Sequence, residues 1–351
     1  MKKFIAAVIG TLLLGTFAIS ACTGGNPNKG EGGDEPNGEI KGSYVEITGG
    51  ELTEKLNGLT LEELFGDTSS KDWKFGFEFT ADVEIDADVN AAQGERAEQF
   101  LKLNLNEESK LKAMFAATEK QTALGGLTMK MQNNNRLNGK LGKSEILGIE
   151  EDIEFNYSIN VHADDENIYF QIPDMSDLPL PFEIAEGKFK APVEYVLSFV
   201  SDLLPVAMTQ AAEGDAQAVD DLLGDYKLKA YADESDGLKI KISADKQSLY
   251  AALEEIAGIS AEKAQGFATF NDFAIDLYFE TDRNGKFERA GFVADIDCDL
   301  TAKAGDLGED VPALSGPIKV QADIVIRKFS DEIILPTEEE LKEYTDITAS
   351  E

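Results

Sequence analysis

The sequence predicts a mainly β protein of the α+β class, built on one large, curved antiparallel sheet. We expect an unclosed β-barrel of about ten strands, with inserted helices that plug it. Three observations predict this fold. One long run alternates strictly between apolar and polar residues, shorter alternating runs follow it as far as residue 326, and stretches with helical spacing interrupt them.

The longest alternating run covers residues 73–89. Every odd position from Trp73 to Val89 is apolar, and every even position is polar or glycine. A period of two indicates a strand with one apolar face and one solvated face. At about 3.3 Å per residue the strand would be roughly 55 Å long, which is far longer than an ordinary strand.

Alternation predicts the other strands in chain order. They are expected at 100–106, continued at 111–117 after Glu107 and Glu108, and then at 127–131, 137–141, 153–161, 168–172, 228–232, 238–242, 273–279, 292–300 and 318–326. Turns are expected at 132–136, which holds three consecutive asparagines, at 164–167, and at 282–285, where Asn-Gly favours a hairpin.

Helical spacing interrupts the strands at several places. Short helices are expected near 52–59, at 215–223, 248–257, 260–265 and 337–344. Residues 172–192 carry four prolines and are expected to be irregular and extended. Pro192 suits the first position of a longer apolar helix that continues to Met208, with a kink at Pro205.

The first residues predict export and membrane anchoring. Two lysines precede an apolar run at 4–19, which is too short for a stable spanning helix. The tetrad that ends at Cys22 (Ile-Ser-Ala-Cys) resembles the bacterial lipobox, in which the cysteine becomes lipidated. The alternative is an ordinary secretory signal with a chance cysteine. We adopt the lipoprotein interpretation, with acyl chains on Cys22 anchoring the protein outside the cytoplasm.

These signals divide the chain into four parts. Residues 1–21 are the predicted signal peptide, and 22–42 are the lipidated cysteine with a flexible tether rich in Gly, Asn and Pro. Residues 43–346 form one β-sheet domain, because no linker interrupts them. Residues 347–351 are expected to be a disordered tail.

Composition excludes several classes of partner. Acidic residues outnumber lysine and arginine by 67 to 32, for a net charge of −35, which disfavours nucleic acid and anionic headgroups as electrostatic partners. Carboxylates stand on one face at 82–88 and at 295–299. They could bind Ca²⁺, but pairing with lysines on neighbouring strands explains them better, so no metal site is expected.

No pattern in the sequence indicates an enzyme. Phosphate loops, nucleophile elbows, CxxC pairs and HExxH motifs are absent. Cys298 stands on the apolar side of its run and is expected to be a small buried hydrophobe. His162, the only histidine, ends a strand and is expected at the surface. We therefore expect neither catalysis nor a cofactor.

The aromatic half of the long strand is the candidate binding site. If the sheet curls, its concave side would face the helix that follows Pro192. The ligand-binding residues expected on this basis are Trp73, Phe75, Phe77 and Phe79 from the strand and Val196, Val200 and Leu203 from the helix. The alternative is a fully packed core, in which the same side chains simply fill the space between sheet and helix.

Several pieces together resemble the open-barrel lipoprotein carriers, namely the periplasmic chaperones LolA and LolB and the mycobacterial lipid-binding lipoproteins. These pieces are the lipobox with its tether, the very long first strand, the hairpin that ends at Phe170, the helix at Pro192 and the 282–286 hairpin. The resemblance is one of architecture. It implies an unclosed, bent sheet plugged by helices, with acyl chains held between them.

Two functional hypotheses follow from these patterns. The first is a membrane-anchored lipoprotein that binds a lipid or acyl chain without chemistry. The second is a structural or interaction lipoprotein of the cell envelope, which has a filled core and presents its acidic face to a protein partner.

Overall fold

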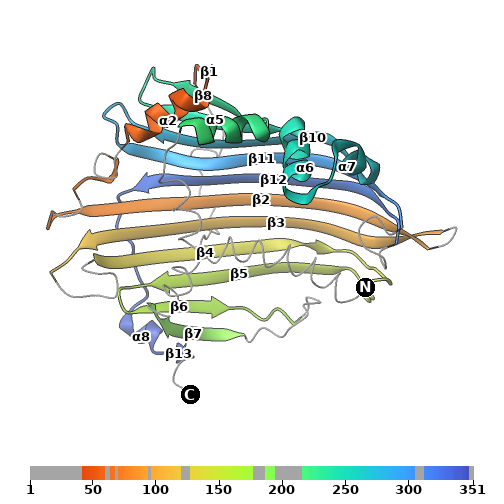
Figure 1. Cartoon of the computed structure of the whole chain (residues 1–351). Helices are drawn as coiled ribbons and strands as arrows, with labels where there is room; N and C mark the ends of the chain where they lie inside the picture. The colour runs from red at the N-terminus through yellow and green to blue at the C-terminus, as the bar shows by residue number, and fades with distance from the viewer. Residues whose placement is uncertain are drawn as a thin grey trace.

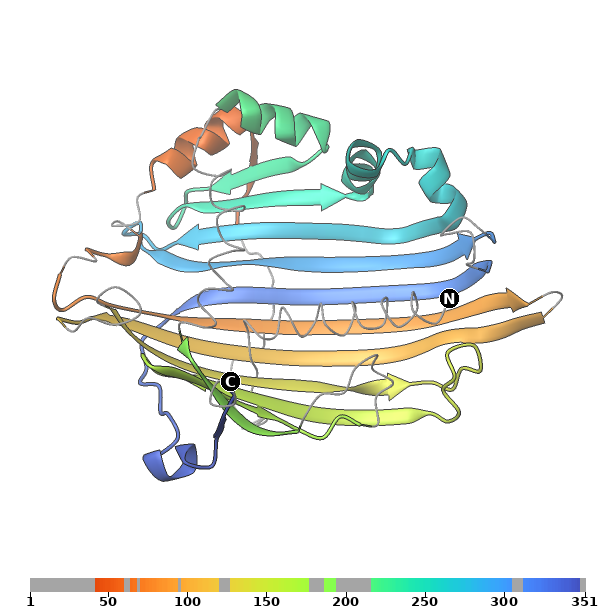
Figure 2. The same cartoon turned by 60° about the horizontal axis from the view of Figure 1, so that its bottom comes forward.

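The computed structural model describes residues 42–59, 64–67, 70–93, 96–119, 127–176, 186–193, 216–304 and 312–347. In this part of the chain, thirteen strands form a single large sheet with few helices (Figure 1). The sheet is twisted, curves on the side of β5 to β7 and stays open (Figure 2). The predicted mainly β class and open antiparallel sheet are confirmed.

Two antiparallel meanders build the sheet. The first runs through β2 (Lys74–Gln93), β3 (Arg96–Ala117), β4 (Leu127–Leu141), β5 (Ile153–Ala163), β6 (Asn167–Ile172) and β7 (Gly187–Pro192). The second runs through β8 (Lys229–Asp233), β9 (Lys239–Asp245), β10 (Ala268–Thr281), β11 (Phe287–Ala302) and β12 (Leu314–Phe329). The short strands β1 (Val45–Ile47) and β13 (Thr345–Asp346) lie at the two edges, β13 parallel to β7.

The meanders join where β12 pairs with β2. The long strand predicted at 73–89 is therefore the central strand β2, with β12 on one side and β3 on the other. Ile85, for example, lies between Val320 and Leu105. We call the face that carries the odd-numbered residues of β2 the inner face, and the opposite face the outer face.

The inner face carries the main hydrophobic core. Its centre is the second half of β2, where Val83, Ile85 and Val89 are all buried. Their partners in the same cluster come from neighbouring strands and two loops: Leu101, Leu103, Leu105, Leu137, Leu141, Ile149, Phe155, Tyr157, Met175, Ala302 and Leu314. The period-two pattern of the sequence thus places one apolar row on each strand against the next.

Most of the helices lie near β8 to β11, and the last one lies at the opposite edge of the sheet beside β13 (Figure 1). α2 (Gly49–Asn57) and α5 (Ala216–Asp225) pack with β8 and β9 around Leu52 and Ile240. Ile240 pairs with Phe279 on the next strand, and the successive pairs across the sheet lead through Ala290 and Ile326 to Phe79 on β2. This packing is therefore on the inner face. α6 (Lys246–Ala257) and α7 (Ala261–Phe267) stand near β9 to β11, and α8 (Glu338–Leu341) precedes β13. Among the described residues, no helix has the length and hydropathy needed to cross a membrane.

Helix ends follow local sequence signals. Thr48 and Glu51 form a capping box at the start of α2, and Thr337 and Glu340 form one at α8. Gly258 ends α6 in the left-handed conformation, with φ of 64°. The helices predicted near 52–59, 215–223, 248–257, 260–265 and 337–344 are therefore confirmed, with small shifts of their ends.

Opposite charges pair across the strands of the outer face, as predicted from the lysine and carboxylate ladders. Lys110 lies 3.0 Å from Glu78, and Lys319 lies 2.9 Å from Asp297. Such exposed pairs contribute at most about 1 kcal/mol each. Their arrangement nevertheless explains why so many acids alternate on this face. Among the described residues, no cluster of three or more His, Cys, Asp or Glu side chains could hold a metal ion.

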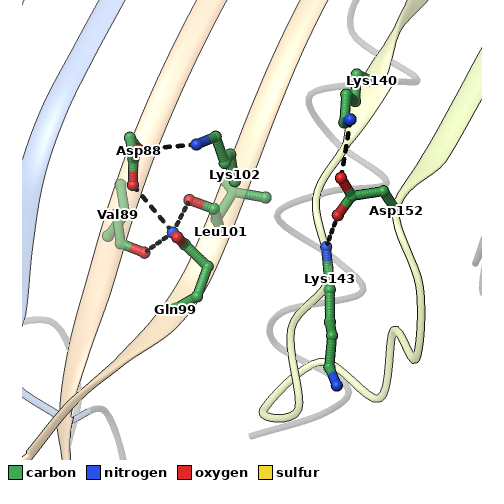
Figure 3. A network of polar contacts seen from close by, with 8 residues as sticks. All are labelled: Asp88, Val89, Gln99, Leu101, Lys102, Lys140, Lys143 and Asp152. Atoms are coloured by element: carbon green, nitrogen blue, oxygen red, sulfur yellow. Dashed lines mark hydrogen bonds and ion pairs between the residues drawn. The ribbon is translucent and has the colours of Figure 1, made fainter.

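Figure 3 shows two of these contacts at one end of the sheet. Asp88 accepts a hydrogen bond from the amide of Gln99 at 3.1 Å and lies 3.5 Å from the ammonium of Lys102. Gln99 also donates to two backbone carbonyls where the β2–β3 register shifts. Asp152 accepts from the backbone of Lys143 at 2.9 Å and contacts Lys140 at 2.8 Å.

Three expectations about local structure are wrong. Residues 132–136 are the middle of β4 and not a turn, because β3 and β5 pair with them on both sides. Pro192 is the last residue of β7, paired with Asn167, and the helical conformation begins at Val193. The stretch expected to be irregular therefore contains strand β7. By contrast, the run at 100–106 continues into 111–117 as expected, within one strand.

The expected turns at 164–167 and 282–285 are confirmed. Asn167 begins β6 immediately after the first of them, and its carbonyl accepts from the Asp164 backbone at 3.0 Å. Gly285 has φ of 74°, a conformation that suits glycine, and donates its N–H to the Asp282 carbonyl at 2.9 Å.

Candidate functional site

The aromatic half of β2 lies on the inner face, but it is less covered than the rest of the strand. Phe75, Phe77 and Phe79 are half-buried, and so is Trp73, which directly precedes β2. From Ala81 onward the inward side chains are buried. The same face therefore changes along one strand from partly accessible aromatic rings to packed core.

The four predicted aromatics are joined by rings from other elements. Phe65 stands edge-on to Phe75 with centroids 4.6 Å apart, and Phe115 of β3 stacks on Phe77 at 6.2 Å. Phe287 of β11 lies 5.6 Å from Phe65. The indole N–H of Trp73 donates to the Phe65 carbonyl at 3.0 Å, which ties the segment at 64–67 to the start of the strand.

A pocket of about 290 Å³ opens at this aromatic end. It is formed where the start of β2, the end of β12 and the segment at 64–66 meet. Its lining is mainly apolar with lysines among it: Leu64, Phe65, Gly66, Lys74, Phe75, Gly76, Met114, Lys286, Lys328, Phe329 and Ser330. A side chain at position 76 would collide with Met114 and the Phe329 carbonyl, so glycine is required there.

A buried polar cluster lies on the inner face between the aromatic end and the packed core. It consists of Glu107 and Ser109 on β3 and of Asn133 and Asn135 on β4, all buried. Ser109 donates to the Asn135 side-chain oxygen at 3.0 Å. The register places Glu107 between Val83 and Leu137.

Glu107 is the unusual member of this polar cluster. Its side chain is only 2% exposed, and among the described residues neither carboxyl oxygen has a hydrogen-bond partner. Burial raises the pKa of this carboxyl to about 7, because the charged form loses its hydration. A glutamate of this kind holds a proton near neutral pH.

A larger cavity, of about 620 Å³, lies elsewhere and has a different character. Its lining is almost entirely charged or polar: Asp236, Lys239, Glu280, Asp282, Arg283, Asn284, Glu288, Arg289 and Arg327. Within it Arg289 donates to buried Glu280 at 2.8 Å and lies 5.3 Å from the Tyr278 ring. This lining does not suit a hydrophobic ligand.

The remaining reactive side chains lie on separate strands. Cys298 on β11 is buried as predicted, and burial raises the pKa of its thiol. His162 on β5 is half-buried, so its expected surface position is wrong, and burial lowers the pKa of the imidazole. Five neighbouring pairings separate β11 from β5 in the sheet, so these two residues form no catalytic pair.

Some predicted site residues lie outside the described residues. These are Cys22 with the signal and tether, and Val196, Val200 and Leu203 of the helix expected after Pro192. The sequence interpretation missed Glu107, although its odd position between Leu105 and Ser109 already assigns it to the inner face. It also missed Phe65 and Phe287, whose contacts depend on the tertiary fold.

Comparison of the sequence with protein-family models gives no match, and comparison with curated proteins gives no significant similarity.

Proposed function

We propose that this protein is an exported lipoprotein that is anchored to the bacterial membrane through Cys22 and binds a lipid or acyl chain without catalysis. The ligand would contact Trp73, Phe75 and Phe77 at the aromatic end of the inner face. Its partners would be the membrane, through the acyl chains of Cys22, and this hydrophobic ligand.

One observation carries this proposal. The aromatic rings of β2 are half-buried, and one of them, Phe75, lines a pocket of about 290 Å³ at the end of the strand, whereas the inward side chains from Ala81 onward are buried. Partly exposed aromatic clusters next to an apolar pocket are typical of ligand sites, whereas a purely structural row would be covered along its whole length. The pocket, at about 290 Å³, is just below the usual range of roughly 300–1,000 Å³, which suits one chain better than several.

The rival hypothesis, a structural envelope lipoprotein, is favoured by the second half of β2, whose inward side chains are buried in the main hydrophobic core. In that case the acidic outer face would contact a protein partner. The two hypotheses differ in whether a hydrophobic molecule reaches Trp73.

Trp73 is the only tryptophan of the chain, so its fluorescence reports on the aromatic end alone. The experiment titrates the protein with a brominated fatty acid and with a brominated long-chain alcohol. We expect at least one of them to quench the Trp73 fluorescence saturably, because bromine quenches an indole that it contacts. The unbrominated compounds should give no quenching.

A matched control moves the tryptophan to helix α5, which does not line the pocket. Leu222 on α5 is 51% exposed, and the variant W73F/L222W should show only weak, non-saturating quenching. Equal quenching in both proteins, or none in the wild type, would argue for the structural hypothesis.

The membrane anchor is tested separately. Replacing Cys22 by serine removes the only thiol that could be acylated in the predicted lipobox, so Cys22→Ser should move the protein from the membrane fraction to the soluble fraction. Cys298→Ser, which changes the buried cysteine, is the control and should leave fractionation unchanged. Membrane association that persists in Cys22→Ser would refute the anchor.

A further inference from the structure

The charge of the aromatic-end pocket is opposite to that of the chain. Acidic residues outnumber lysine and arginine by 67 to 32 overall, yet the pocket lining contains three lysines and no acid. The lysines come from three separate parts of the fold: Lys74 from β2, Lys328 from β12 and Lys286 from the β10–β11 hairpin. Their convergence is therefore produced by tertiary structure and not by a basic stretch of sequence.

Within the part of the chain that the structure describes, these lysines are also not engaged in ion pairs. Among the described residues, no carboxylate lies within 4.0 Å of the ammonium groups of Lys74, Lys286 or Lys328, while other strand lysines such as Lys110 are paired. Two of these lysines act on Asp282. Its pKa is lowered mainly by a hydrogen bond from the Lys286 backbone, with a minor contribution from the charge of Lys328.

Apolar groups stand directly beside these charges. Phe65, Phe75, Met114 and Phe329 line the same pocket. A fourth lysine, Lys112, lies 5.0 Å from the Phe329 ring, but its ammonium is also 3.9 Å from Glu78 and is partly neutralised there. An apolar pocket bordered by lysines that have no carboxylate partner among the described residues matches a molecule with a chain at one end and an anion at the other.

We propose that this pocket binds a single-chain anionic amphiphile, with its chain among Phe65, Phe75 and Met114 and its carboxylate or phosphate head on Lys74, Lys286 and Lys328. The inference deepens the proposed function and rests on it, because it assigns a head-group chemistry to the hydrophobic ligand.

The negative charge of the whole protein does not prevent this binding. At physiological ionic strength the Debye length is about 8 Å, so distant carboxylates are largely screened. The three lysines act at contact distance, where charge-assisted hydrogen bonds to a carboxylate or phosphate are roughly twice as strong as neutral ones. Local charge therefore decides the affinity for the head group.

Calorimetric titration of the full-length protein with dodecanoate, dodecyl phosphate and dodecanol tests the inference. All three probes share one chain, so their affinities differ only through the head group. We expect both anions to bind at least about tenfold more tightly than the alcohol, a difference equivalent to about 1.4 kcal/mol. The ratio between the two anions then shows whether the site selects carboxylate or phosphate.

Two double variants, each of which removes two positive charges, test whether the preference for anionic probes arises at the pocket. K286Q/K328Q should lose the preference for the anions and keep the affinity for dodecanol. K102Q/K319Q removes two outer-face lysines that pair with Asp88 and Asp297 and should bind all probes as the wild type does.

The outcomes separate this inference from the proposed function. Dodecanol binding as tightly as the anions would overturn the anionic head group and leave hydrophobic binding standing. An equal loss in K102Q/K319Q would overturn the pocket as its location. Failure of all three probes to bind would count against the proposed function itself.

Discussion

The variant Glu107→Gln is expected to gain stability relative to the wild type as the pH rises. The difference in unfolding free energy between the two proteins should increase by roughly 3 kcal/mol between pH 4 and pH 8. The cause is the buried carboxyl, whose pKa is raised from 4.5 to about 7 in the folded protein. Below about pH 4.5 the group is protonated in both the folded and the unfolded state, so it has no effect on the pH dependence of folding.

Between these two pKa values the unfolded chain releases the proton and the folded protein keeps it. Each pH unit then costs the wild type about 1.4 kcal/mol, and above pH 7 the cost stays constant. Glutamine has nearly the same shape and does not titrate. The gap in unfolding free energy between Glu107→Gln and wild type should therefore widen from pH 4.5 to pH 7 and be level beyond.

Chemical denaturation at a series of pH values measures this gap. Glu84→Gln is the matched control, because Glu84 is an exposed glutamate on the outer face of the neighbouring strand β2. Its gap to wild type should remain flat over this range. A flat profile for Glu107→Gln as well would mean that the Glu107 carboxyl is solvated or paired in solution.

Arg289→Ala is expected to destabilise the fold by about 3–5 kcal/mol, since it leaves the buried carboxylate of Glu280 without its partner. Glu280 is 3% exposed, and its oxygen accepts from Arg289 at 2.8 Å. The aromatic ring of Tyr278 further encloses the guanidinium. Only 5% of the Glu280 side chain is exposed, so its charge would remain mostly unsolvated when its partner is removed.

The test measures thermal or denaturant unfolding of four proteins: the wild type, Arg289→Ala, a double variant and a control. The double variant E280L/R289L removes both charges and should recover most of the stability, because burying two apolar side chains avoids the desolvation of the pair. Arg283→Ala breaks the exposed ion pair with Asp236 and should cost less than about 1 kcal/mol. Equal losses in Arg289→Ala and Arg283→Ala would show that Glu280 is accessible to water.

The fold class was predictable because alternation is a local property that survives in any antiparallel sheet. Strand β2 follows from its period-two pattern, and the hairpin at Gly285 follows from the Asn-Gly pair. The asparagines at 133–135 misled the prediction, since their turn preference is weaker than the hydrogen bonds from β3 and β5. Pro192 misled it for a similar reason, because a proline is tolerated at the end of a strand near a sheet edge.

The candidate site was only partly predictable. The inward position of Trp73, Phe75, Phe77 and Phe79 follows from the strand pattern. Their partial exposure does not, because it depends on which other segments cover them. The convergence of the lysines at the pocket likewise required the pairing of β12 with β2, which joins residues far apart in the sequence.

The pairing of β12 with β2 also governs when the protein can fold. β2 emerges early during synthesis or export, but half of its backbone hydrogen bonds are made to the last long strand of the chain. Closing so long a loop is entropically unfavourable and makes folding slow. The first meander therefore carries an open edge along β2 until β12 arrives. Under the proposed export, the chain would therefore stay unfolded until its C-terminal region has crossed the membrane.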